Sequence, residues 1–184
     1  MTPSLRGRLL VATPLLGAGV FERTVILLLE HGIYEGAVGV VLNRPSDLDL
    51  GGPMPAWREA AADPPVVFLG GPVSQGGAIC LGWAGSAAAA AWEPLVGQLG
   101  VIDLSRPPEE VLAGVQRVRV FTGYAGWAPG QLEGELDAEA WVVADAEPGD
   151  ALSAEPDLLW RSVLRRQGGE VAWLANAPDD PSLN

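Results

Sequence analysis

Lysine is absent from this 184-residue chain, and cysteine and histidine occur only once each. All 11 basic residues are therefore arginines, which we read as genome composition because arginine also stands at positions typical of ordinary surface. The lone cysteine, Cys80, cannot form a disulfide within the chain, which favours a reducing compartment and a cytoplasmic location. His31 is the only histidine, so any catalytic pair of a nucleophile and a histidine would have to use it.

Positive charge is also scarce, because 23 acidic residues outnumber the 11 arginines and give a net charge of −12. Surfaces that bind nucleic acid must neutralise phosphates, so this balance argues against direct DNA binding. Residues 120–160 carry nine acids and no base, which is unfavourable for a DNA-binding face there. The first 60 residues hold five arginines and six acids, and leave room only for a small basic patch.

Uncharged stretches long enough for a membrane segment are few, and their composition favours a folded core. Arg6 and Arg8 precede an apolar stretch at 9–21, as in a signal peptide, but Pro14 interrupts it and core-like sequence follows. Residues 66–92 are uncharged and could span a bilayer by length. Six glycines, a proline and several polar residues in that stretch favour buried strands instead, so we expect no membrane segment.

The length and the 48% hydrophobic content predict one globular domain, which we place at residues 1–177 with a flexible tail at 178–184.

The predicted elements follow from the hydrophobic pattern. Near-continuous apolar runs at 24–30 and 37–42 predict strands buried on both faces. The full set of predicted strands is 8–13, 24–30, 37–42, 66–69, 78–83, 96–104, 117–122 and 141–145. The predicted helices are 55–62, 107–116 with Ser105 as its cap, 129–136 and 156–167. Residues 87–91 fit either a helix or a loop. The elements do not alternate strictly, which predicts an α+β or mixed α/β fold with a sheet that bends or closes on itself.

Residues 123–130 hold two glycines, two large aromatics and a Pro-Gly pair in a short span. Glycine permits unusual backbone angles, and an aromatic beside it can be held rigidly in a cleft. We therefore predict a shaped loop at 123–127 that presents Tyr124 and Trp127 for stacking on a flat ligand. Gly126 lies between them, and Gln131 begins the helix that follows.

The polar residues Arg23, Thr24, Asn43 and Arg44 flank two of the apolar strands. The two arginines could hold a carboxylate or phosphate bidentately. They could equally pair with nearby glutamates and cap strand ends, and both interpretations stay open at this stage.

Gly70 and Gly71 directly follow a predicted strand, which suggests that the backbone approaches a ligand closely. A tight turn explains the pair as well, and the surrounding sequence matches no nucleotide-binding loop.

Catalytic and metal-binding patterns are weak. Cys80 lies in an apolar strand, where a buried and inert thiol is the default. Glu30 and His31 are adjacent and would point to opposite faces of a strand, and no cysteine pair or spaced histidines exist, so we expect no metal site. Glu133 and Glu135 do not share a helix face, which argues against a paired-carboxylate hydrolase.

Several blocks spread over nearly the whole chain carry a family resemblance: residues 7–12, 21–25, 30–31, 36–45, 70–73 and 123–133. Together they resemble the AlgH/YqgE family of bacterial proteins. The resemblance implies a single α+β domain with a bifurcated or barrel-like sheet and flanking helices, in the bacterial cytosol. The family carries the label of a transcriptional regulator, without an established activity or demonstrated DNA contact. This chain departs from the common pattern at residues 17–20, which lack a frequent Met and Asp, and at 81–83, which lack a frequent His.

We interpret the sequence as a binding module whose ligand is a small anion-bearing molecule or a protein segment. The residues expected to converge on one cleft are Arg23, Thr24, His31, Asn43, Arg44, Gly70, Gly71, Tyr124, Gly126, Trp127 and Gln131. The alternative is a hydrolase with His31 as general base. We assign no catalytic residue, cofactor or metal from the sequence.

Overall fold

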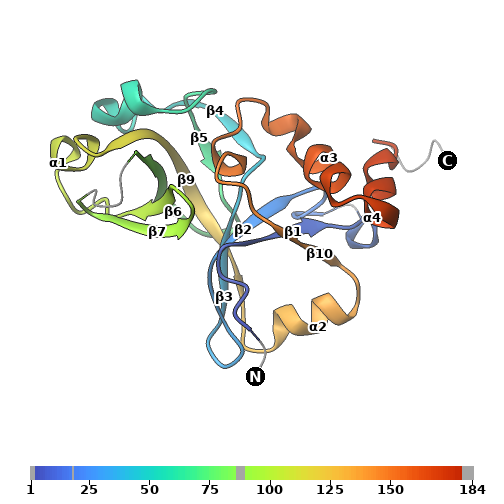
Figure 1. Cartoon of the computed structure of the whole chain (residues 1–184). Coiled ribbons are helices and arrows are strands. Elements are labelled where there is room, and N and C mark those ends of the chain that lie inside the picture. The colour runs from blue at the N-terminus through green and yellow to red at the C-terminus, as the bar shows by residue number, and fades with distance from the viewer. Residues whose placement is uncertain (1–2, 18, 86–89, 180–184) are drawn as a thin grey trace.

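A branched β-sheet runs through the molecule, flanked by short helices (Figure 1). The computed structural model describes residues 3–17, 19–85 and 90–179. Its ten strands are β1 Arg8–Ala12, β2 Val25–Gly32, β3 Gly36–Val41, β4 Pro45–Asp49, β5 Val66–Leu69, β6 Val73–Ala84, β7 Trp92–Val96, β8 Leu99–Ile102, β9 Val115–Trp127 and β10 Trp141–Asp145, counted over these residues. The α-helices in the same ranges are α1 Pro108–Leu112, α2 Gln131–Asp137, α3 Pro156–Gln167 and α4 Gly169–Trp173. Short 3-10 helices occur at η1 Pro14–Leu16, η2 Pro55–Ala60, η3 Asp150–Leu152 and η4 Leu174–Asn176.

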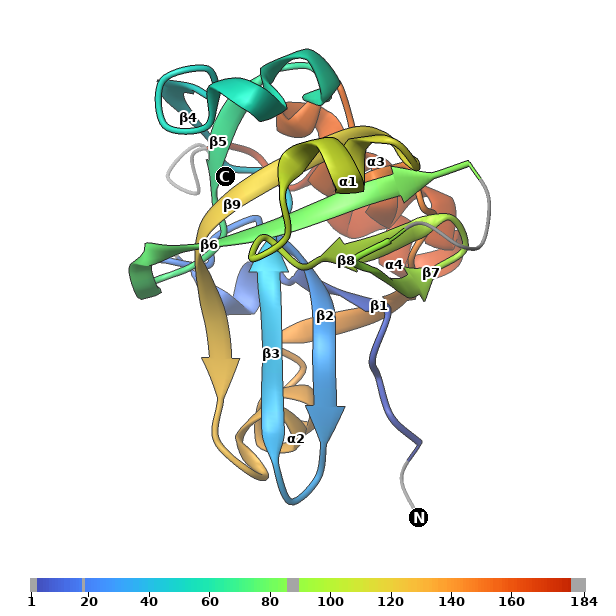
Figure 2. The ribbon, with the colours of Figure 1, turned by 90° about the vertical axis from the view of Figure 1, so that its left-hand side faces the viewer.

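Strand β9 is where the sheet divides. Its first part pairs antiparallel with β6, for example Ala78 with Thr122, and in parallel with β5. Its last residues pair antiparallel with β3, where Ala37 lies opposite Trp127. The strand order is β10-β1-β2-β3-β9-β6-β8-β7, with β4 attached through β5. Figure 2 shows β9 as one long, curved strand that serves both halves. The predicted mixed fold with a bifurcated sheet is confirmed.

The β1–β2–β3 half is buried on both faces, as the unbroken apolar runs predict. Along β2, Val25 and Leu27 face one core, and Ile26 and Leu28 face another. The first core lies under α3, and Leu132 of α2 packs into the second. Figure 1 shows α3 and α2 on opposite sides of these strands.

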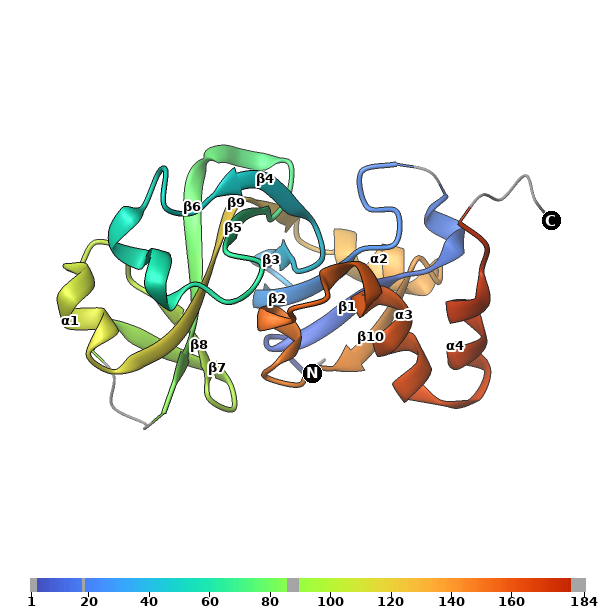
Figure 3. The same cartoon turned by 90° about the horizontal axis from the view of Figure 1, so that it is seen from above.

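The β6–β8–β9 half has a third core of its own, into which Trp57 of η2 and Val111 of α1 pack. Figure 3 shows, from above, that this half extends away from α3 and α4. Cys80 is fully buried in this core. Burial raises the pKa of its thiol, so Cys80 is the inert residue that the sequence suggested.

The predicted loop at 123–127 is wrong, because these residues form the end of β9. Gly123 has φ +70°, and a Cβ there would lie 2.2 Å from the main-chain oxygen of Gly71. Gly123 therefore lets β9 pass close to the β5–β6 connection, and does not shape a loop.

Other differences concern short polar elements. Strands β4 and β7 were not predicted, because each holds a proline and charged residues that break the apolar pattern. The predicted strand 96–104 is shortened to β8 by a turn, and the predicted helix 55–62 is the 3-10 helix η2. Ser105 does not cap α1; its hydroxyl donates to Asp103 at 2.6 Å. Residues 87–89 and 180–184, which carry part of the ambiguous segment and of the predicted tail, lie outside the described residues.

Over the described ranges, no helix has both the length and the apolar character needed to cross a bilayer.

Candidate anion-binding site

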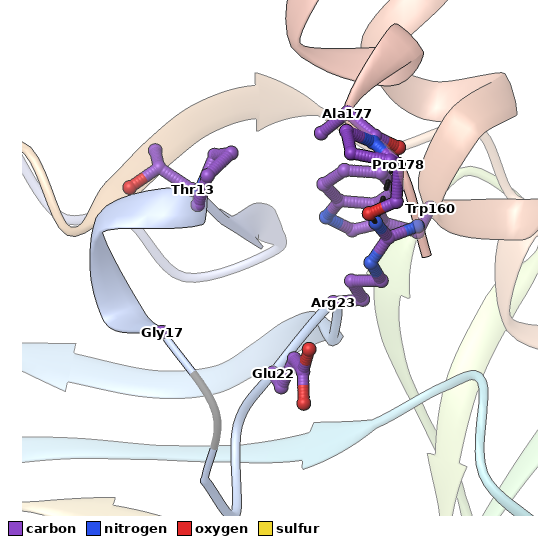
Figure 4. Close-up of a pocket in the computed structure, with 8 residues that line it drawn as sticks. Thr13, Gly17, Glu22, Arg23, Trp160, Ala177 and Pro178 are labelled. Carbon is purple, nitrogen blue, oxygen red and sulfur yellow. Dashed lines mark hydrogen bonds between the residues drawn. The ribbon is translucent and has the colours of Figure 1, made fainter. Parts of the chain in front are cut away.

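Trp160 of α3 forms the platform of the candidate site (Figure 4). Its indole nitrogen donates to the main-chain oxygen of Ala12 at 2.8 Å, which fixes the ring against β1. The guanidinium carbons of Arg23 and Arg161 lie 4.8 and 5.7 Å from the ring centroid. Both cations are therefore within the range of cation–π attraction to the Trp160 indole.

Arg23 has an unusual backbone that Asn43 holds in place. Its φ is +53°, a left-handed conformation that costs an L-residue about 1–2 kcal/mol. The Asn43 side chain donates to the main-chain oxygen of Arg23 at 2.8 Å and accepts from the main-chain N–H of Val25 at 3.0 Å. These two bonds fix the chain on both sides of Thr24, so the direction of the Arg23 side chain is set by the fold.

Arg44 and Thr24 hold the loop that leads into β2. Arg44 donates to the main-chain oxygens of Val20 and of Glu22, the latter at 3.0 Å. Burial lowers the pKa of Arg44, and the charge of Glu22 opposes this shift. Thr24 is fully buried and donates to the main-chain oxygen of Phe21 at 2.9 Å. Arg44 therefore lines the site while its guanidinium serves as a clamp.

Asp179, in the C-terminal segment of the chain, forms ion pairs with both Arg23 and Arg161. One carboxylate oxygen of Asp179 accepts from Arg23 at 2.8 Å and from Arg161 at 2.7 Å. The Arg23 guanidinium also donates to the main-chain oxygens of Ala177 and Pro178. The Asp179 side chain is 90% exposed, so this carboxylate is held at the surface and not in the interior.

Two adjoining pockets meet at Glu22, Arg23 and Trp160. The first, drawn in Figure 4, has a volume of about 140 Å³ and is closed by Ala177 and Pro178. The second has a volume of about 250 Å³ and is lined by Asp179 together with Arg23, Arg44 and Arg161. The volumes suit a small ligand.

His31 lies elsewhere, and both of its ring nitrogens are engaged. Nδ1 accepts from the main-chain N–H of Leu5 at 3.0 Å, so the proton of the neutral ring is on Nε2. Nε2 lies 2.9 Å from Glu133, and the His31 side chain is only 3% exposed. Burial would raise the pKa of Glu133, but the hydrogen bond from His31 and others bring it below its ordinary value. Both ring nitrogens of His31 are therefore already hydrogen-bonded within the protein.

The aromatic side chains of the motif pack into or against the core. Trp127 is buried, stacks on Phe21 at 6.4 Å and donates to Glu135 at 2.9 Å. Tyr124 packs against the first core, and Gly126 is exposed on β9. Gln131 donates to Glu135 at 3.1 Å. The predicted stacking face of Trp127 is therefore covered by the protein itself.

Gly70 and Gly71 lie at the crossing of β5 and β9. A Cβ on Gly70 would come within 2.4 Å of the Gly123 oxygen, and one on Gly71 within 2.1 Å of a main-chain carbon of Tyr124. Gly71 and Arg44 also line a separate pocket of about 400 Å³. The predicted residues thus divide among different pockets. We call the pocket around Arg23, Trp160, Arg161 and Asp179 the arginine site, and of the predicted residues only Arg23, Asn43 and Arg44 line it.

A family model described as AlgH-like matches residues 9–172. The chain belongs to the AlgH-like family. A UPF0301 protein of Streptomyces coelicolor is 51% identical and spans 98% of this chain and 96% of that relative. Among solved structures, a Corynebacterium diphtheriae protein superposes with a TM-score of 0.87 at 32% identity, covering 95% of this chain and 93% of that one. The AlgH protein from Pseudomonas aeruginosa gives 0.70 at 28% identity, covering 98% of both chains.

In this AlgH-like chain, the sequence alone did not identify half of the arginine site. Trp160, Arg161 and Asp179 come from the C-terminal region, far in sequence from Arg23. Asp157 and Arg161 have the i,i+4 spacing of a helical ion pair, but in the structure Arg161 binds Asp179. Three arginines and a tryptophan on one helix were the available signal, and nothing local showed which loop they would meet.

Proposed function

We propose that this AlgH-like protein is a binding module that captures a small carboxylate- or phosphate-bearing ligand between Arg23 and Arg161. The observation that carries the proposal is the Asp179 carboxylate oxygen, which accepts from both guanidinium groups at 2.8 and 2.7 Å. Hydrogen bonds between charged partners are roughly twice as strong as neutral ones, and arginine suits planar anions. Asp179 thus serves as an internal stand-in for the anionic group of the ligand.

Preorganisation of the site supports the proposal. Trp160 is buried and fixed by its bond to Ala12, and Asn43 fixes the backbone at Arg23. A site whose side chains are already held in place loses less conformational entropy when a ligand binds. The left-handed backbone at Arg23 is a further indication, because strained residues gather at functional sites.

Because Asp179 already pairs with Arg23 and Arg161, it competes with any anionic ligand for these two arginines. A ligand must displace Asp179 from the arginines, and an exposed ion pair of this kind costs little to break. We therefore expect moderate affinity in the intact chain and a stronger one when the competing carboxylate is removed. Any regulatory role would then follow from ligand capture and not from DNA contact, since a net charge of −12 repels phosphate backbones.

The experiment is a calorimetric titration with succinate and, separately, with inorganic phosphate. Arg161→Gln removes one guanidinium, and Arg23→Asn removes the other while keeping a residue type that tolerates the left-handed backbone. Each variant is expected to weaken binding about tenfold or more. Arg106→Gln is the matched control, because Arg106 is an exposed arginine that pairs with Glu110 away from the site.

Unchanged binding in both site variants, with intact thermal unfolding transitions, would refute the proposal. Equal losses in the Arg106 variant would mean that binding reflects general charge and not this pocket. Absence of any heat with either anion in the wild type and in the Asp179→Asn chain would also count against it.

A further inference from the structure

An apolar groove lies between α4 and the end of α2, and it shares Thr13 and Pro14 with the pocket drawn in Figure 4. Trp141 and Val142 of β10 line it, and its volume is about 470 Å³. Leu15, Leu136 and Leu174 line its walls. Figure 1 shows β10 passing between α4 and α2.

The apolar surface of this region is exposed to an unusual degree. Leu15 is 71% exposed. Trp173, at the end of α4, is 78% exposed. Isolated exposed leucines need no explanation, but a leucine and a tryptophan exposed on two elements that line one apolar groove are typical of a surface that another molecule covers.

The charges around the groove are of one sign. The charged lining residues are Glu139 and Glu170, and no arginine lines it. Both carboxylates are exposed, and no ion pair joins either one to a cation within the described ranges. A ligand that enters this groove therefore gains by carrying positive charge next to apolar groups.

Glu139 is held at the rim by its backbone. Its φ is +57°, and the hydroxyl of Thr13 donates to its main-chain oxygen at 2.8 Å. The main-chain N–H of Thr13 also donates to the oxygen of Ala140 at 2.9 Å. The fold thus maintains a strained, non-glycine conformation at the residue that places this carboxylate at the edge of the groove.

We propose that the groove binds a basic amphipathic segment of a partner protein, with its apolar side chains in the groove and its cations against Glu139 and Glu170. This is the helix-in-groove mode of recognition, in which one face of the segment supplies the apolar anchors. A second copy of this chain is disfavoured as the occupant, because two molecules of net charge −12 would bring acidic surfaces together. An anionic lipid surface is disfavoured for the same reason.

The test uses a fluorescent helical peptide with leucines on one face and lysines on the other, followed by anisotropy at about 0.15 M salt. Two comparison peptides replace its lysines by glutamates or its leucines by serines. The full chain should bind the leucine–lysine peptide at least about tenfold more tightly than either comparison peptide. Leu15→Asn should weaken binding, because it removes an exposed apolar anchor.

The decisive variant reverses both rim charges, Glu139→Lys with Glu170→Lys. The matched control is Glu59→Lys with Glu109→Lys, which changes the net charge equally on η2 and α1, in the other half of the molecule (Figure 3). The rim variant should lose about tenfold in affinity or more, and the control should change by less than about twofold.

Equal losses in both double variants would overturn the proposal, because binding would then follow bulk charge. Tight binding of the leucine–glutamate peptide would overturn it as well. So would a concentration-dependent dimer that dissociates on Leu15→Asn, or binding to anionic vesicles that the rim variant abolishes, because each would assign the groove to a different occupant.

Discussion

Asn43, two residues after the end of β3, donates its side-chain amide to the main-chain oxygen of Arg23 at 2.8 Å, across 20 residues of sequence. The same side chain accepts from Val25, so one asparagine satisfies two main-chain groups beside a left-handed residue. Asn43→Ala leaves both groups unpaired. We expect a loss of about 1–3 kcal/mol in the free energy of unfolding, measured by urea denaturation, together with weaker anion binding.

The control for this prediction is Asn176→Ala, because Asn176 is an exposed residue of η4. Its effect should stay within about 0.5 kcal/mol. If Asn43→Ala lowers the free energy of unfolding no more than the control does, the hydrogen bonds of Asn43 to the main chain at Arg23 and Val25 do not stabilise the protein.

Gly123 and Gly134 should respond to alanine in opposite directions. A Cβ on Gly123 would lie 2.2 Å from the Gly71 oxygen, at a φ of +70°, so Gly123→Ala should destabilise the fold by about 2 kcal/mol or more. Gly134 lies inside α2 with nothing within 4 Å of the added atom. Gly134→Ala should stabilise the protein by about 0.5–1 kcal/mol. Thermal unfolding of the two variants checks both signs, and a neutral Gly123 variant would refute the tight crossing.

The lowered pKa of Glu133 should make the stability of the protein sensitive to acid. Burial acts to raise its pKa, but hydrogen bonds, chiefly from His31, bring the pKa below its ordinary value of about 4.3. A carboxylate with a lowered folded-state pKa stabilises the protein above the unfolded value, and this stabilisation is lost as the pH falls through the folded value. Glu133→Gln should therefore flatten the loss of stability between about pH 5 and pH 3. Urea midpoints over this range measure it, with the exposed Glu59→Gln as control; parallel curves for wild type and Glu133→Gln would contradict the linkage.

Arg119 should be indispensable to the junction between β9 and the loops around it. Its buried guanidinium donates to the main-chain oxygens of Ala151, Ser153 and Asp63 at 3.2, 2.9 and 2.5 Å, and lies 4.1 Å from the centroid of Phe68. Burial lowers its pKa to about 10, which leaves it charged at neutral pH, although its Nε has no partner among the described residues.

Arg119→Met leaves these three oxygens without their donor and should cost about 3 kcal/mol or more in urea unfolding. Arg119→Lys should recover only part of the loss, because an ammonium cannot span all three. Arg117→Met, at an exposed position two residues earlier on β9, is the matched control. A shift no larger than that of the control would show that the buried cation contributes little.

The strands with continuous apolar sequence were predictable because burial on both faces removes any need for polar alternation. Residues 24–30 and 37–42 illustrate this, and the long helix 156–167 follows from its apolar stripe and its terminal glycines. The 123–127 segment was not predictable, because glycine permits a loop and a close strand crossing equally well. Only the partner backbone at Gly71 decides between them.

The candidate site shows the same limit. Arg23, Asn43 and Arg44 could be grouped from sequence because they flank two adjacent strands. Trp160, Arg161 and Asp179 join them only through the packing of α3 on the sheet, which no local pattern encodes. His31 and Trp127 carry functional residue types, but their hydrogen bonds to Glu133 and Glu135 assign them to the framework.

The most direct measurement of the central claim is the succinate affinity of the Asp179→Asn variant by calorimetry. The account predicts that removing this competing carboxylate from Arg23 and Arg161 tightens binding by about threefold or more, which corresponds to the modest worth of an exposed ion pair. Asp47→Asn, an equal charge change at an exposed position of β4, should leave the affinity unchanged. Equal affinities for wild type and Asp179→Asn, or equal gains in both variants, would contradict the claim that the arginine pair is an anion site occupied by the chain itself.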